Sequence, residues 1–266
     1  MRLVDLTTTL DPANRDRMPP HLQGMAGIIS PKIKYLAPDS DEGRDRMCAF
    51  FGCSHADLRD GEGWGAEVLT EMSSHCGTHV DAPLHSGSTS EGRRARTVDE
   101  IALDELFCPG MVLDVRQWVS PSQAISIDAL QRAIDATGRQ VRQGDAVLIR
   151  TGQERYTMAD EMFFMYPGMT RESTLFLSEQ GATVLGTDAM AWDRPFKAMA
   201  LAWRETGDNR HLWDGHKAIR EREAFIIQQL TNLAALPLTG FQVGFFPIKL
   251  KGASAAPARV VAFLPD

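Results

Sequence analysis

The amino-acid sequence predicts a single α/β domain. Short apolar and β-branched segments alternate with amphipathic ones along most of the chain, an order typical of strands and helices interleaved in one domain. No internal repeat, low-complexity tract or linker divides the 266 residues, a length that one large domain can accommodate. We therefore assign residues 1–266 to one domain, in which 1–65 form a strand and an extended loop or arm, and 66–266 form the core.

The individual elements follow from apolar spacing and turn residues. Leu3 to Leu6 is predicted to be the first strand, and a strand, helix, strand unit is predicted over Met111 to Val115, Ile127 to Thr137 and Ala146 to Arg150. Pro109 and Gly110 are expected to end a short helix that precedes this unit. Further helices are predicted at 98–107, 173–180 and 215–222, a buried strand at 183–186, another apolar segment at 225–230, and paired strands at 242–250 and 260–264.

A long segment from Asp11 to about Gly65 lacks a clear helical period. Segments of this length without regular structure usually carry function or pack on another subunit, so a substrate lid or a dimer arm is expected here. Phe50, Phe51 and Trp64 are candidate aromatic walls of a substrate pocket, and the alternative is that they fill a core or a subunit interface.

Composition excludes several classes of protein. The chain is 43% hydrophobic and 24% charged, which is ordinary for a soluble globular protein. A net charge of −7 gives no general attraction to nucleic acid or to anionic membranes. No signal peptide or spanning apolar run is present, and the four cysteines form no CxxC pair, so a reduced protein in the cytoplasm is expected.

Residues 75–85 contain three histidines and one carboxylate at short spacings. A lone histidine is most often a satisfied surface or core residue, but His75, His79, Asp81 and His85 together have the residue types that zinc, manganese and iron favour. Gly77 and Pro83 argue against a regular helix, and a turn entering a short strand could aim His75, His79 and Asp81 at one point. Three protein ligands that leave an open position are typical of a catalytic metal.

The remaining residues of this segment suggest supporting roles. His85 is less easily a ligand in the same shell, and its near-neutral intrinsic pKa suits a general acid/base. Thr78 could steady Asp81 or a bound water through its hydroxyl, or make a local turn bond. Cys76 could be a thiolate ligand or nucleophile, although we favour a small residue that faces away from the metal.

A second polar segment lies near His216. Folding could bring His216 into the site, whereas His211 and Asp214 are expected at the surface. Asp188 follows an apolar strand and could either line a pocket or close a turn. Trp192 and Phe196 flank the next loop, where a flat aromatic substrate could stack on them, with core packing as the alternative.

The run HxGTHxDxPxH at 75–85 resembles the signature of the metal-dependent cyclase family, which includes kynurenine formamidase and isatin hydrolase. The resemblance implies a swivelling β/β/α fold with a mixed sheet, and a homodimer or larger homo-oligomer in which the N-terminal arm completes the neighbour's pocket. The family places a Glu twelve residues after the histidine that corresponds to His216, and Gln228 stands there instead. A neutral amide holds a second cation less well, so one divalent metal is expected. The resemblance to isatin hydrolases, which use a single manganese, favours manganese over zinc. Further similar segments lie at 3–7, 186–188, 246–249, 252–254 and 259–262.

These observations predict a metal-dependent hydrolase with a small-molecule substrate. The leading hypothesis is an isatin hydrolase-like enzyme, in which water bound to the metal attacks a cyclic amide or an N-acyl group of a small aromatic compound. N-formylkynurenine formamidase and dienelactone hydrolase are the alternatives. A non-catalytic metal-binding or ligand-binding protein on the same scaffold is also considered, but His85 is not needed for binding alone. No GxSxG motif supports a serine triad.

Overall fold

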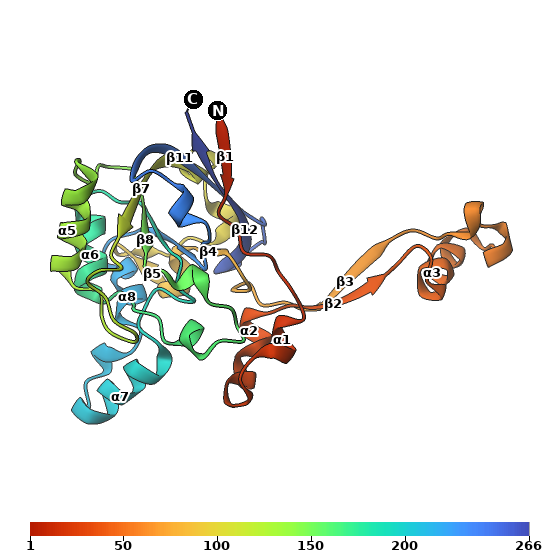
Figure 1. Cartoon of the computed structure of the whole chain (residues 1–266), viewed down its shortest axis with the longest axis horizontal. Coiled ribbons are helices and arrows are strands. Elements are labelled where there is room, and N and C mark those ends of the chain that lie inside the picture. Colours follow the sequence, from red (N-terminus) through yellow and green to blue (C-terminus); the bar gives the residue numbers. More distant parts are fainter. Residues whose placement is uncertain (266) are drawn as a thin grey trace.

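Residues 1–265, which the computed structural model describes, form an α/β domain around one large mixed sheet (Figure 1). The strand order is β1-β12-β11-β7-β8-β9-β10-β4, and β12 also pairs with β4. The strands from β12 to β4 therefore close into a barrel, and β1 extends the sheet along the far end of β12. The pairs from β7 to β10 are parallel and the others are antiparallel, as a mixed sheet requires. The strands are β1 (Arg2–Asp5), β4 (His79–Asp81), β7 (Phe107–Asp114), β8 (Ala146–Arg150), β9 (Val184–Thr187), β10 (Phe225–Gln228), β11 (Thr239–Pro247) and β12 (Ala255–Leu264).

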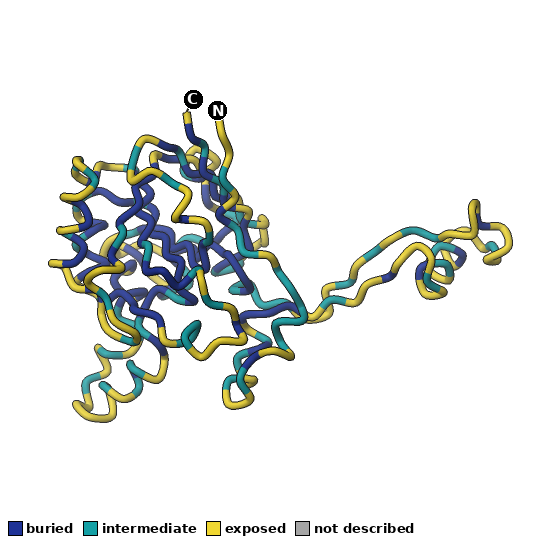
Figure 2. The backbone as a smooth tube through the Cα atoms, in the orientation of Figure 1, coloured by how far each residue is buried: buried dark blue, intermediate teal, exposed yellow. Residues whose placement is uncertain are grey.

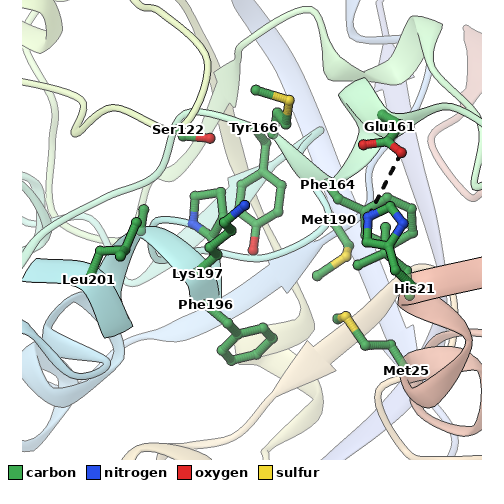
Figure 3. Close-up of a pocket in the computed structure, with 14 residues that line it drawn as sticks. His21, Met25, Ser122, Glu161, Phe164, Tyr166, Met190, Phe196, Lys197 and Leu201 are labelled. Carbon is green, nitrogen blue, oxygen red and sulfur yellow. Dashed lines mark ion pairs between the residues drawn. The ribbon is translucent and has the colours of Figure 1, made fainter. Parts of the chain in front are cut away.

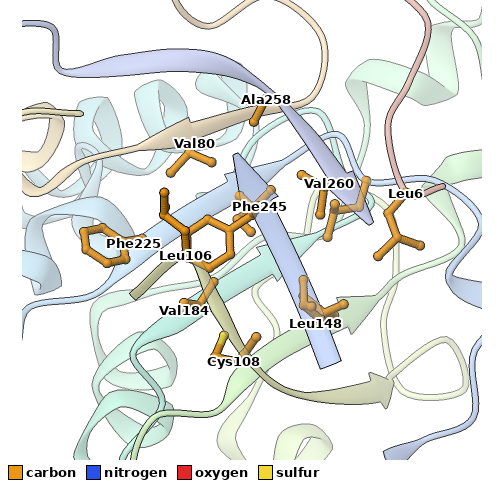
Figure 4. Close-up of a cluster of buried hydrophobic side chains, with 14 of the residues drawn as sticks. Leu6, Val80, Leu106, Cys108, Leu148, Val184, Phe225, Phe245, Ala258 and Val260 are labelled. Carbon is orange, nitrogen blue, oxygen red and sulfur yellow. The ribbon is translucent and has the colours of Figure 1, made fainter. Parts of the chain in front are cut away.

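Two hydrophobic clusters lie on the two faces of this sheet. Along β8, Leu148 points into the cluster inside the barrel, whereas Val147 and Ile149 point into the cluster under the helices. Because β8 is buried on both faces, its sequence is a continuous apolar run and does not alternate. Figure 4 shows the interior cluster, to which strands all around the barrel contribute side chains.

Helices α5 (Ile127–Thr137) and α6 (Arg171–Glu179) pack on the outside of the parallel strands (Figure 1). Helix α5 has the bounds that the sequence predicts, because both of its ends carry strong signals. The Ser126 side chain accepts a hydrogen bond from the backbone N–H of Ala129, and Gly138 ends the helix at φ 74°. The other helices of the core are α4 (Pro83–Ser86), α7 (Phe196–Thr206) and α8 (Asp214–Lys217).

An arm projects from the body of the molecule (Figure 1). Its stem is the antiparallel pair β2 (Lys32–Leu36) and β3 (Ala66–Glu71), and its far end carries α3 (Asp41–Phe51). Figure 2 shows that most of the arm is exposed. The arm therefore extends past residue 65, where the sequence placed the start of the core.

The segment from 11 to 65 is more regular than its sequence predicts. Besides β2 and α3 it contains two short helices at the base of the arm, α1 (Asn14–Arg17) and α2 (Ala26–Ile29). Helix α3 begins at Ser40, whose hydroxyl accepts from the backbone N–H of Gly43. It was missed because it packs on little of the chain and so has no continuous apolar face.

The helix predicted at 98–107 is wrong. Two short 3-10 turns, Val98–Glu100 and Leu103–Leu106, lead directly into β7. In each turn the glutamate side chain accepts a hydrogen bond from the backbone N–H three residues before it, Glu100 from Thr97 and Glu105 from Ala102. Pro109 and Gly110 do not end a helix but lie inside β7, on the side that pairs with β11. The small pair β5 (Thr89–Ser90) and β6 (Arg93–Arg94) precedes this segment.

All four cysteines lie in the described part of the chain and carry free thiols. The Sγ atoms of Cys48 and Cys53 are 3.3 Å apart at the end of α3. None of the helices within residues 1–265 is long and apolar enough to cross a membrane.

Candidate metal centre

The short strand β4 organises the site. It lies between β10 and β12, and successive side chains of a strand point to opposite faces, so His79 and Asp81 share one face. Gln228 is the partner of His79 across the β10 to β4 pairing, which places its amide on the same face within reach of Asp81. The side chains of Thr78 and Val80 point to the opposite face.

His79 presents an unused ring nitrogen to the site. Its Nδ1 donates to the carbonyl oxygen of Gly77 at 2.8 Å, which leaves Nε2 with its lone pair directed outward. This Nε2 is buried and has no hydrogen-bond partner among the described residues. Burial lowers the pKa of His79, so the ring is neutral as a metal ligand must be. Gly77 has φ +60°, and this left-handed conformation turns its carbonyl toward the ring.

His75 and Asp81 complete a set of three donors with His79. The His75 Nδ1 lies 3.1 Å from Asp81 Oδ1, and the His79 Nε2 lies 3.5 Å from the same oxygen. The candidate ligand atoms of these three residues all lie within 4.8 Å of one another. Two imidazoles, one carboxylate and an unsatisfied buried Nε2 fit a divalent cation, and hydrogen bonds alone leave that nitrogen without a partner.

His85 and His216 form a second group of candidate donors with Asp81. Their ring nitrogens and the Asp81 carboxylate also lie within 4.8 Å of one another. The His85 ring is 4.1 Å from the His75 ring and 4.8 Å from the Trp213 ring, measured between centroids. Burial and the neighbouring imidazoles lower the pKa of His85 to about 3, against the opposing charge of Asp81. The His85 ring is therefore neutral at physiological pH, with a pKa below the near-neutral value expected of a general acid/base.

Asp193 holds His216 in place and was not identified from the sequence. Its carboxylate accepts a very short hydrogen bond from His216 Nδ1, a bond of 3.1 Å from the His216 backbone N–H and one of 2.6 Å from the Gly215 backbone N–H. The His216 Nε2 thus faces Asp81 Oδ2, at 3.4 Å. Burial lowers the pKa of His216, but the charge and hydrogen bond of Asp193 outweigh burial and raise it to about 9.

Gln228 joins the site through its amide group. The Nε2 donates a short hydrogen bond to Asp81 Oδ2 and lies 3.4 Å from His216 Nε2, while the Oε1 accepts from the Trp192 backbone N–H at 3.1 Å. In this orientation Gln228 steadies Asp81 with a donor and adds no negative charge. The structure therefore brings both His216 and Gln228, distant in sequence, to the predicted cluster.

Two neighbours of the ligands have other contacts than those expected. The Thr78 hydroxyl donates to the Gln229 carbonyl at 2.6 Å and accepts from the Thr8 backbone N–H at 2.8 Å, so the expected contact with Asp81 is not made. The alternation of side chains along β4 explains this, because Thr78 points away from Asp81. Cys76 is fully buried, and burial raises the pKa of its thiol to about 12, which fits the small buried residue that we favoured.

The three aromatic candidates of the arm and the Trp192 ring do not surround the metal cluster of their own chain. Phe50, Phe51 and Trp64 lie together at the far end of the arm, with the Trp64 ring 5.5 Å from that of Phe50 and 6.1 Å from that of Phe51. For the Trp192 ring the structure shows the core-packing alternative: the ring is only 1% exposed, packs in the cluster under the helices and donates from Nε1 to Thr174. Only its backbone N–H, which bonds Gln228, takes part in the site.

Asp188 is buried away from the metal cluster. Its carboxylate accepts hydrogen bonds from the Thr151 hydroxyl and from the backbone N–H groups of Thr151, Gly152 and Gln153. His211 is half-buried, and Asp214 accepts from the Arg171 backbone N–H. Neither belongs to the groups of metal donors in the described part of the chain.

A closed mixed barrel in which the short strand β4 carries imidazole and carboxylate donors, with further histidines beside them, defines a metal-dependent enzyme of the α/β class. Residues 4–194 match the family described as putative cyclase. The chain belongs to this family, as the motif predicted.

Individual relatives agree with this assignment. An isatin hydrolase of Roseibium aggregatum is 24% identical over 216 residues, which cover 76% of this chain and 75% of that protein. A kynurenine formamidase of Paracidovorax citrulli is 27% identical, over 73% of this chain and 78% of that protein. The solved structure of isatin hydrolase A from Ralstonia solanacearum superposes with a TM-score of 0.72 at 24% identity, and covers 99% of this chain and 92% of that one. That structure has the same fold.

Proposed function

We propose that the protein is a metal-dependent hydrolase that opens a cyclic amide or cleaves an N-acyl bond of a small aromatic compound. The observation that carries the proposal is the buried Nε2 of His79, which has no hydrogen-bond partner and lies among the donors of His75 and Asp81. His75, His79 and Asp81 would hold the cation. Membership of the cyclase family and the hydrolase relatives support the reaction class.

A divalent cation bound here would polarise the substrate carbonyl and lower the pKa of water. The protein supplies the proton transfers. His85 lies outside the three-donor set, and its neutral ring accepts the proton of the attacking water and returns it to the leaving nitrogen. A C–O bond forms as the C–N bond breaks, so an amide yields a carboxylate and an amine. His216, held at Nδ1 by Asp193, directs Nε2 to the reacting groups.

We propose one cation and not two. The two groups of candidate donors share a single carboxylate, that of Asp81. One group adds His75 and His79, and the other adds His85 and His216. Gln228 contributes no further carboxylate. Two dications would leave a large uncompensated charge in a buried site, which is costly. The carboxylate suits Mn(II), which the resemblance to the isatin hydrolase branch favours, and the two imidazoles suit Zn(II), which is the alternative.

The arm supports a homodimer or larger homo-oligomer in which one protomer completes the substrate pocket of its partner. Phe50 is 72% exposed and Phe51 is 67% exposed, at the end of an arm that leaves the body of its own chain (Figure 1). Exposed aromatic side chains that gather in this way are typical of interaction sites. These rings, with Trp64, would form aromatic walls for a flat substrate. The free thiols fit a reducing compartment such as the cytoplasm.

Two other substrates remain within the same chemistry. N-formylkynurenine and a dienelactone both present a carbonyl carbon that the same attack would reach, and the bond that breaks is C–N in the first and C–O in the second. Kynurenine formamidases are among the relatives. A non-catalytic binding protein would not need His85 and an anchored His216 beside the three donors.

The deciding experiment combines metal analysis with a substrate panel. Purified protein is tested with isatin, N-formylkynurenine and a dienelactone, each with Mn(II) and with Zn(II). We expect about one metal ion per chain, turnover of one substrate, loss of turnover with chelator, loss of metal in His79→Ala, and loss of turnover with retained metal in His85→Ala. A protein that binds no divalent ion, or a chelated protein with full activity, would exclude the proposal. Full turnover by metal-loaded His85→Ala would exclude the role of His85.

A further inference from the structure

A cavity lies outside the metal cluster, between the N-terminal half of α7, the base of the arm and the turn Glu161–Phe164 (Figure 3). Its volume is about 480 Å³, within the range of pockets that bind small organic molecules. None of the histidines of the metal cluster lines it. Its walls are mainly methionine and aromatic side chains, among them Met25, Phe164, Met190 and Phe196.

Tyr166 brings an unpartnered hydroxyl to this cavity. The residue is only 1% exposed, yet its hydroxyl has no hydrogen-bond partner among residues 1–265. Figure 3 shows the hydroxyl directed toward the middle of the lining residues. Burial, with the charge of Asp193, raises the pKa of Tyr166, so the hydroxyl keeps its proton and can donate. Because Tyr166 lines the cavity and its hydroxyl has no protein partner, an acceptor atom of a ligand in the cavity would take up its hydrogen bond.

The charged groups of the cavity are unevenly paired. The Glu161 Oε1 lies 3.8 Å from the His21 Nε2. Lys197, on the first turn of α7, lines the cavity and makes no ion pair within the described residues. The His21 and Glu161 pair and Lys197 lie on opposite sides of the cavity in Figure 3. One side of the cavity therefore favours an anion.

We propose that this cavity binds a small aromatic carboxylate, with the carboxylate between the Lys197 ammonium and the Tyr166 hydroxyl and the ring among the methionine and phenylalanine side chains. Methionine side chains adapt to flat rings and make favourable sulfur contacts with them. Phe164 and Phe196 can stack on the ring or meet its edge. A neutral amide of the same shape lacks the charge that pairs with Lys197.

The cavity also touches the loop that anchors His216. Met190 and Pro195 line it on either side of Asp193, the residue that bonds His216. An occupied cavity would restrain this loop. We therefore expect the ligand to change turnover as well, an effect that rests on the proposed function, whereas the binding itself does not.

Calorimetry on chelator-treated full-length protein tests the site with 2-aminobenzoate as the probe and 2-aminobenzamide as its neutral analogue. We expect the carboxylate to bind at least about tenfold more tightly than the amide, and Tyr166→Phe and Lys197→Met each to weaken it about tenfold. Lys249→Met, which removes a charge elsewhere, is the matched control and should bind as the wild type. Met190→Trp should fill the cavity and abolish binding.

Several outcomes would overturn the proposal. Equal binding of carboxylate and amide, or unchanged binding in both Tyr166→Phe and Lys197→Met, would exclude the cavity as an anion site. Loss of binding in His79→Ala would place the probe at the metal cluster. Binding that appears only when Phe50 and Phe51 are replaced by serine would show that the arm of another copy occupies the cavity. If Met190→Trp unfolds, the near-isosteric Tyr166→Phe keeps the test decisive, and a failed substrate panel would leave these binding results unaffected.

Discussion

Replacing Asp193 with asparagine should disable His216 without removing the metal. The carboxylate accepts three hydrogen bonds, from His216 Nδ1 and from the backbone N–H groups of Gly215 and His216. Asparagine is neutral and keeps one acceptor oxygen, so its NH₂ group opposes either the Gly215 N–H or the two N–H groups of His216. Without the negative charge the pKa of His216 falls and the hydrogen bond at Nδ1 weakens, so Nε2 is held less firmly toward Asp81.

The size of the effect follows from the bonds that are lost. A hydrogen bond to a charged group contributes about 1.5–3 kcal/mol. If that free energy is lost only in the transition state, kcat falls roughly 10-fold to 150-fold, since about 1.4 kcal/mol corresponds to a factor of ten. KM and metal content should stay close to the wild-type values, because His75, His79 and Asp81 keep their contacts.

Three measurements check this prediction: kcat and KM on the substrate that the panel identifies, metal content by mass spectrometry, and the pKa of His216 by NMR of the ring nitrogens. The matched control is Asp214→Asn, because Asp214 accepts from the Arg171 backbone and is not a hydrogen-bond partner of the His216 ring within the described residues. It should keep the wild-type kcat. Metal-loaded Asp193→Asn with wild-type kcat, or with an unaltered His216 pKa, would refute the anchoring role of Asp193.

Three further predictions concern Gln228, Asp188 and Gly77. Gln228→Glu adds a second carboxylate beside Asp81, so we expect metal content to rise from one ion per chain toward two; unchanged stoichiometry would mean that charge at this position does not limit the site. Burial raises the pKa of Asp188 to about 6 against its four hydrogen bonds. The buried, protonated Asp188 carboxyl therefore stabilises the fold fully below about pH 4. Up to about 3 kcal/mol of the free energy of unfolding is lost as the pH rises from there through 6. Urea titrations across this range should show this loss of unfolding free energy in the wild type but not in Asp188→Asn. The same pH dependence of unfolding free energy in both proteins would contradict the prediction. Gly77→Ala forces a Cβ to 2.4 Å from Leu10 Cδ2 at φ +60°, so we expect a loss of about 1–2 kcal/mol in stability by denaturant titration, together with weaker metal binding; an alanine variant as stable as the wild type would contradict the close packing at Gly77.

The donors of the metal cluster were predictable because they are local in sequence. His75, His79 and Asp81 depend on one turn and one strand, so their spacing alone indicates that they meet. Helix α5 was predictable for the same reason, since Ser126 and Gly138 mark its ends within the segment itself.

The parts that could not be predicted depend on distant segments. Asp193 stands 23 residues before His216, in a loop with no repeating pattern, and only the folded barrel brings the two together. The Trp192 ring looked like a pocket wall because aromatic residues serve cores and binding sites equally, and the packing of α6 decides between them. The helix predicted at 98–107 failed because an apolar segment of this length fits a strand entry as well as a helix.

The dual pairing of β12 sets the order in which this protein can fold. Its first residues pair with β4, where Pro257 faces His79, and its last residues pair with β1. The strand that carries the metal donors therefore gains one of its two neighbours only from a segment that lies far along the chain. Contacts between such distant segments form slowly because a long loop must close first. A nascent or truncated chain that lacks β12 would expose the edge of β4 and its unassembled donors, so the metal centre reports on completion of the barrel as well as on its chemistry.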